Sequence, residues 1–81
     1  MVELYEIHQI TKHNTLNVSK YDPICYVKTF DELIKVISIY PTQPMRYVKR
    51  NIDDEEIIAL ATRNSELLKE NNMNKISWLV L

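Results

Sequence analysis

Glycine is absent from this chain of 81 residues, although an average protein of that length contains about six. The absence excludes elements that need a residue without a side chain: the Walker phosphate loop, the dinucleotide-binding glycine fingerprint, the nucleophile elbow and the standard EF-hand loop. We therefore expect no bound cofactor. Asparagine and proline must then form the turns and helix ends, and we expect Asn14, Asn71 and Asn72 to do so.

The sequence also has only one cysteine, almost no net charge and no long apolar run. The single Cys25 cannot form an intramolecular disulfide, which is typical of a reducing, cytoplasmic setting. A net charge of −1 gives no long-range field to attract nucleic acid or an anionic membrane. No apolar run approaches the roughly 20 residues that cross a bilayer, and the first residues lack the features of a signal peptide. We expect a cytoplasmic protein with no membrane partner.

The residues that are present favour one small globular domain over residues 1–81. Ile, Leu and Val make up 24 of the 81 residues, too many for a disordered chain. A core of this size gives marginal stability, so association with a partner or with a second copy is expected. The abundance of Ile, Asn, Lys and Tyr indicates an AT-rich genome, such as that of a low-GC bacterium or one of its phages.

Five segments have strand-like patterns. Residues 2–10 and 15–20 alternate as the two arms of a hairpin. Residues 21–23 read as a turn, and residues 24–27 are apolar on both faces, which favours a central strand. Residues 45–51 alternate again, and residues 75–81 are apolar on both faces at the end of the sequence.

Two helices are signalled by capping sequences. Thr29 with Glu32 forms a capping box, and helical spacing follows up to the residue before Pro41. Asp53, with Glu56 three residues later, predicts the N-cap of the second helix. The apolar positions expected to face the core are Phe30, Leu33, Ile34, Ile37 and Tyr40 in the first helix, and Ile57, Leu60, Ala61, Leu67 and Leu68 in the second. Asn64 interrupts the second set, and it either lies within one helix or caps a new short one.

These elements predict an α+β fold in the order β-β-β-α-β-α-β. The expected architecture is a two-layer sandwich, in which a mixed sheet of four to five strands carries both helices on one face.

Three groups of residues resemble catalytic or metal-binding sets. Cys25 lies in an apolar strand, where a buried thiol packs as a small hydrophobe. His8 and His13 lack the close spacing of zinc ligands, and the acidic run 53–56 is explained by the start of a helix. We expect no catalytic and no metal-binding residues. A pocket that held His8 beside a carboxylate would instead favour an enzyme.

The basic segment Arg46, Tyr47, Lys49 and Arg50 has two interpretations. Cationic side chains around an aromatic ring suit single-stranded nucleic acid. The same residues suit an edge strand that uses charge to prevent sheet-to-sheet aggregation, and we favour this second interpretation.

The apolar end Trp78, Leu79, Val80 and Leu81 also has two interpretations. It forms either an internal strand or an edge that pairs with a partner or a second copy as a homodimer. The sequence as a whole predicts a non-enzymatic protein-binding module, an inhibitor, adaptor or regulator of phage or mobile-element type that acts on a bacterial protein. The alternative is a nucleic-acid-binding accessory protein that uses residues 46–50.

Overall fold

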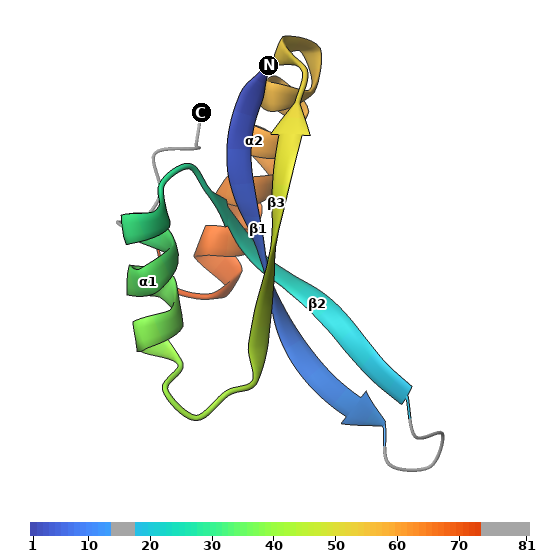
Figure 1. The fold of residues 1–81 in the computed structure, drawn as a ribbon, viewed down its shortest axis with the longest axis vertical. Helices are drawn as coiled ribbons and strands as arrows, with labels where there is room; N and C mark the ends of the chain where they lie inside the picture. The colour runs from blue at the N-terminus through green and yellow to red at the C-terminus, as the bar shows by residue number, and fades with distance from the viewer. Residues whose placement is uncertain (14–17, 74–81) are drawn as a thin grey trace.

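The computed structural model describes residues 1–13 and 18–73. Five elements follow one another: β1 (Val2–His13), β2 (Val18–Val27), α1 (Phe30–Ile39), β3 (Met45–Ile52) and α2 (Asp54–Glu70). The strands form one sheet in the order β2-β1-β3, and β1 pairs antiparallel with both neighbours (Figure 1). This is a small α+β fold, as the sequence predicts.

The sheet is smaller and simpler than the sequence suggested. Three strands form it over the described residues, not four to five, and both pairings are antiparallel rather than mixed. The order of elements there is β-β-α-β-α. The predicted final strand, 75–81, and the predicted turn at Asn14 lie outside the described residues.

One strand replaces two predicted strands and the turn between them. β2 runs through Tyr21, Asp22 and Pro23 without ending. The pairing with β1 shifts between Ile7 and His8, which leaves Ile24 as an extra residue in β2. Pro23 lies opposite His8, whose backbone groups point toward β3, so the Pro23 position faces away from β1 and its missing N–H removes no hydrogen bond from the ladder. A proline followed by a bulge was therefore mistaken for a turn.

Helix α1 begins as its sequence predicts. The Thr29 hydroxyl accepts a hydrogen bond from the Glu32 amide at 3.2 Å, and the Glu32 carboxylate accepts one from the Thr29 amide at 3.1 Å. Leu33 and Val36 are fully buried on its inner side. Phe30 and Ile34, which the spacing assigned to the core, are 52% and 46% exposed because α1 covers only part of the sheet.

Helix α2 is one continuous helix with different caps at its two ends. Asp53 occupies the N-cap position, as the sequence predicts, although its side chain makes no capping hydrogen bond. At the other end, the amides of Asn72 and Met73 donate to the carbonyl oxygens of Lys69 and Leu68, at 3.2 and 2.8 Å. This is the Schellman arrangement, with Asn72 at φ 56° in the place where glycine is usual.

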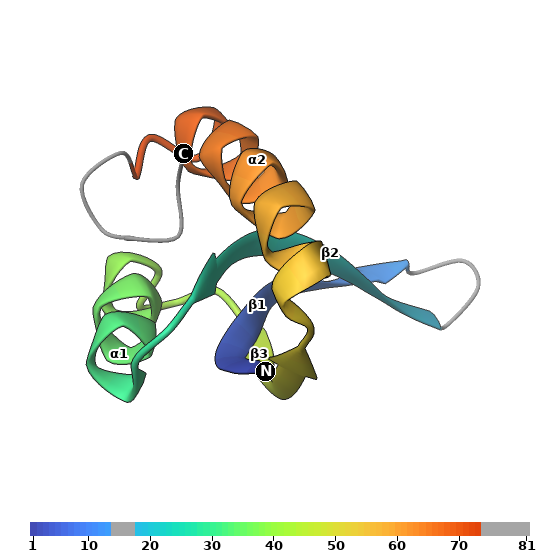
Figure 2. The same cartoon turned by 90° about the horizontal axis from the view of Figure 1, so that it is seen from above.

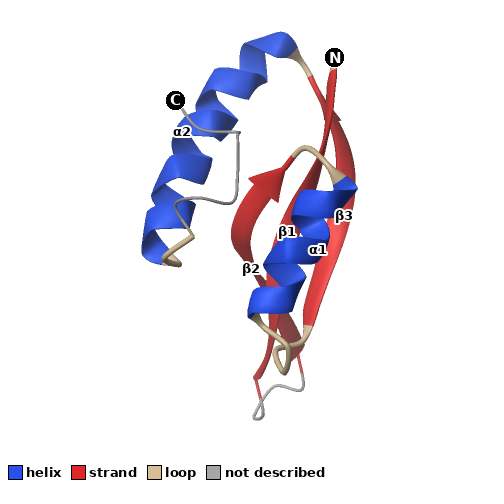
Figure 3. Cartoon of the chain, turned by 90° about the vertical axis from the view of Figure 1, so that its left-hand side faces the viewer, coloured by secondary structure: helices blue, strands red, loops and turns tan. Residues whose placement is uncertain are grey.

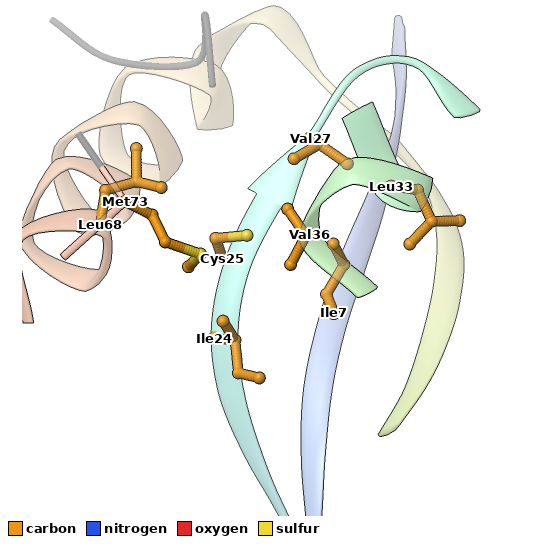
Figure 4. Close-up of a cluster of buried hydrophobic side chains, with 8 residues drawn as sticks. All are labelled: Ile7, Ile24, Cys25, Val27, Leu33, Val36, Leu68 and Met73. Atoms are coloured by element: carbon orange, nitrogen blue, oxygen red, sulfur yellow. The ribbon is translucent and has the colours of Figure 1, made fainter. Parts of the chain in front are cut away.

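The helices do not share one face of the sheet, as had been expected. Helix α1 packs on the face of β1 that carries Ile7 (Figure 4), whereas the first half of α2 packs on the other face, around Leu4. Figures 2 and 3 show the two helices on different sides of the strands. The second half of α2 lies along β2, where Leu68 reaches the cluster around Cys25. The core therefore has two parts, one on each side of β1.

Candidate functional site: the two edges of the sheet

The outer edge of β2 is closed by an asparagine from α2. The Asn64 side chain accepts a hydrogen bond from the Tyr26 amide at 2.7 Å and donates one to the Tyr26 carbonyl at 2.9 Å. Asn64 is fully buried, and it forms with Tyr26 the pair of bonds that another strand would otherwise form. Asn64 thus bonds the sheet from within α2 and does not cap a new helix, the alternative left open by the sequence.

Two further residues protect the same edge. The side-chain amide of Asn71 donates to the Ile24 carbonyl at 3.4 Å and to the Leu67 carbonyl at 2.8 Å. Pro23 follows along the strand and has no N–H to offer an incoming chain. Over the described residues, β2 is therefore an edge strand rather than the central strand that its apolar pattern indicated, and α2 accounts for its burial.

Within residues 1–13 and 18–73, nothing pairs with the outer edge of β3. The Ile10 amide donates to the Pro44 carbonyl at 2.9 Å, so these two residues form a hydrogen-bonded pair of the antiparallel ladder. Every second residue after Pro44 then points its backbone groups toward β1, and the residues between them point theirs away from it. It follows that Tyr47 and Lys49 point their backbone N–H and C=O groups away from β1. Among the described residues, no group bonds these outward amides and carbonyls. Figure 3 shows β3 at the side of the sheet opposite α2.

An aromatic surface adjoins this open edge on the α1 side. The ring centres of Tyr47 and Tyr5 lie 5.7 Å apart, and those of Tyr5 and Phe30 lie 6.2 Å apart. Both pairs have edge-to-face geometry. Tyr47 is 48% exposed. Lys49 completes the surface through an ion pair of 2.9 Å with Glu3, and this hydrogen bond raises the pKa of Lys49.

The opposite face of the same strands holds a charged cluster. The Glu6 carboxylate bonds the Arg50 guanidinium at 2.7 Å and the His8 Nε2 at 2.6 Å. Burial raises the pKa of Glu6, but the hydrogen bonds from Arg50 and His8, together with the charge of Arg50, outweigh it, and the pKa lies below its ordinary value of 4.5. Glu6 is therefore an ionised group held between two partners.

Arg46 extends the cluster toward β2. Its guanidinium stacks 3.5 Å from the centre of the Tyr21 ring, and its Nε donates to the His8 Nδ1 at 3.4 Å. An acceptor role for Nδ1 assigns the ring proton to Nε2, which then donates to Glu6. Among the described residues, Arg46 has no carboxylate partner.

The structure divides the predicted basic segment between two faces. Arg46 and Arg50 lie beside Glu6 and His8, whereas Tyr47 and Lys49 lie on the α1 side. Lys49 and Arg50 are each already paired with a carboxylate. Among the described residues the segment lies on an edge strand, as the favoured interpretation requires, whereas the use of its charge against aggregation stays a prediction. The other predicted interface, Trp78 to Leu81, lies outside the described residues.

His8 does stand beside a carboxylate, the arrangement that would favour an enzyme. It is only 6% exposed, however, and both of its ring nitrogens are engaged, by Glu6 and by Arg46. Cys25 packs on the other side of the sheet, where burial raises the pKa of its thiol to about 12.

Sequence reasoning missed the role of Asn64 and the closed edge of β2. A signal was present, because a polar residue within the apolar face of a helix requires a buried partner. The partner itself, a backbone segment 38 residues away, could not be read from the pattern.

Comparisons with known proteins identify no relative. No protein-family model, no curated protein and no solved structure matches this chain. In the part of the chain that the structure describes, no helix is both long and apolar enough to cross a membrane.

Proposed function

We propose that this chain is a protein-binding module without catalytic activity, of the inhibitor, adaptor or regulator type. Its binding site is the open edge of β3 together with the exposed side chain of Tyr47. A partner segment adds to the sheet as a further strand, bonding the outward backbone groups of Tyr47 and Lys49.

The observation that carries this proposal is the difference between the two edges. Three residues protect β2, and two of them bond its backbone through side-chain amides from α2. β3 has no such cover among the described residues, and it exposes Tyr47 by 48% and Val48 by 39%. The cations of β3 discourage pairing with a like-charged strand, but its outward backbone groups remain uncovered beside exposed aromatic area, which favours a docking role.

Selection of peptides from a random display library, with the whole protein as target, tests the proposal. We expect enriched peptides whose binding protects the amides of Tyr47 and Lys49 from hydrogen exchange. Enrichment of no peptide, or of peptides that protect other amides only, would contradict the proposal.

A proline substitution at the edge supplies the matched test. Lys49→Pro removes one outward N–H without touching the bonds to β1, and edge strands tolerate such a proline. Lys49→Ala removes the same side chain and keeps the N–H. We expect Lys49→Pro to abolish binding of the selected peptides and Lys49→Ala to retain it. Equal binding by the two variants would show that the edge is not used.

A further inference from the structure

The charge of β3 limits what can pair with it. The strand carries Arg46, Lys49 and Arg50 and no carboxylate. Side chains directly opposite each other on paired strands lie on the same face, about 5 Å apart, where like charges repel and opposite charges attract. The occupant of this edge is therefore selected by charge as well as by hydrogen bonding.

A second copy of β3 is a poor occupant. Antiparallel self-pairing centred on Val48 places Arg46 opposite Arg50 of the second copy, and pairing centred on Lys49 places that residue opposite itself. The register centred on Tyr47 places no cation directly opposite another cation. It still brings the cations of both strands close together, and neither strand has a carboxylate to pair with them. The edge is thus protected against self-association while its backbone remains open.

The two faces of β3 select different side chains. On the face with Glu6, Arg46 has no carboxylate partner among the described residues, and the Glu6 carboxylate holds Arg50 in position. Val48 lies between these two arginines. On the α1 side, Tyr47 presents a half-exposed ring next to Tyr5. A pairing strand thus meets two cations and a valine on one face, and an aromatic ring on the other.

We propose that the partner segment is an extended acidic strand that carries carboxylates opposite Arg46 and Arg50. Between them it carries an apolar residue opposite Val48, and a further apolar residue packs on the Tyr47 ring. This inference rests on the proposed function and specifies the chemistry of the partner at the same site.

Three synthetic peptides test the charge selection on the whole protein. They are Thr-Glu-Thr-Val-Val-Glu-Thr, its counterpart with lysine in place of both glutamates, and its counterpart with glutamine. Two opposite-charge pairs across strands predict that the acidic peptide binds about tenfold more tightly than the lysine peptide, with the glutamine peptide between them. Equal binding of the acidic and lysine peptides, or absence of binding by the acidic peptide, would overturn the inference.

Charge reversal in the protein provides the reciprocal test. Arg46→Glu is expected to weaken binding of the acidic peptide by about fivefold to tenfold and to strengthen binding of the lysine peptide. The control Lys35→Glu makes the same charge change on the exposed side of α1 and is expected to leave both affinities nearly unchanged. Equal effects of the two substitutions would show only a response to net charge and would overturn the inference. Arg46→Gln removes the charge without reversing it, and it gives an intermediate affinity if Arg46→Glu proves poorly folded.

The outcomes separate this inference from the proposed function. If library-selected peptides protect the Tyr47 amide but contain no excess of Asp or Glu, the partner chemistry is wrong and the binding edge stands. If sedimentation of the protein alone shows a dimer that Lys49→Pro dissociates, a second copy occupies the edge and the acidic-strand inference is wrong.

Discussion

Asn64 joins α2 to the edge of β2 through two buried hydrogen bonds. Asn64→Ala leaves the amide and the carbonyl of Tyr26 buried without these partners. We expect a loss of about 2–4 kcal/mol in the free energy of unfolding, since each unmade buried hydrogen bond costs about 1–3 kcal/mol. Urea denaturation followed by circular dichroism measures this loss.

Asn51→Ala is the matched control for that substitution. Asn51 is exposed on β3, and its truncation is expected to change stability by less than about 0.5 kcal/mol. Equal losses for the two variants would show that the bonds between Asn64 and Tyr26 contribute nothing particular to stability.

Glu6 makes stability depend on pH. Its pKa in the folded protein lies below the ordinary 4.5, so its stabilising contribution is complete above that value. The contribution is lost as the pH falls through the lowered pKa of the folded state. Glu6→Gln is expected to cost about 1–3 kcal/mol at pH 7, because Arg50 and His8 lose a charged partner. In acid well below pH 4.5, the variant and the natural protein should be equally stable.

Glu3→Gln provides the comparison for Glu6. Glu3 and Lys49 are each about half exposed in their ion pair, where water and salt screen most of the attraction between the two charges. Urea denaturation at several pH values should therefore show a much smaller effect at Glu3. A difference between Glu6→Gln and the natural protein that persists unchanged in acid would show that the cause is packing rather than charge.

The residue scale is also where sequence reasoning was weakest. Alternation along β3 already implied that Arg46 and Arg50 share one face, since residues two apart in a strand do so. It could not show that Glu6 and His8 face them, because those contacts depend on the register between β1 and β3. The same limit applies to Asn64. The sequence shows a polar residue on an apolar helix face, but its hydrogen-bond partner Tyr26 lies in a strand 38 residues away.

At the scale of the element, the end of α2 shows how the chain manages without glycine. Asn72 takes the left-handed conformation at φ 56°. Asparagine tolerates this conformation better than other residues with a side chain, and glycine tolerates it best. Asn72→Gly is therefore expected to keep or slightly raise the melting temperature, whereas Asn72→Ala should cost about 1 kcal/mol.

Asn71 lies one position earlier and serves as the control for backbone conformation. Its φ is −103°, outside the left-handed region, so replacement by glycine gains nothing from relief of strain and also removes the side-chain hydrogen bonds to Ile24 and Leu67. Thermal unfolding of Asn72→Gly and Asn71→Gly should differ in direction, with Asn71→Gly the less stable. Equal losses for both would contradict the conformational explanation.

Helix boundaries were predictable from sequence because they depend on neighbouring residues. The capping box of Thr29 and Glu32 and the end of α1 before Pro41 follow from local chemistry. Strand number and sheet order were not predictable in this way. The apolar run 24–27 has the pattern of a central strand, and only the packing of α2 beside it explains that pattern on an edge strand.

At the scale of the whole molecule, the two sheet edges are expected to differ in hydrogen exchange. The Tyr26 amide is bonded to Asn64 on the closed edge, so its exchange requires α2 to separate from β2. The outward amides of Tyr47 and Lys49 have no such bond among the described residues and should exchange close to the rate of an unstructured peptide. Two-dimensional NMR of the protein dissolved in D₂O distinguishes these sites one by one.

The amide of Val48 makes this comparison internal to one strand. It points toward β1 in the same ladder, so it should exchange far more slowly than its neighbours Tyr47 and Lys49 even though all three lie on β3. An alternating pattern along β3, together with slow exchange at Tyr26, would show that one edge is closed and the other open in the free protein. Slow exchange at Tyr47 and Lys49 without added peptide would instead show that the edge is already occupied, and a binding role for it would then fail.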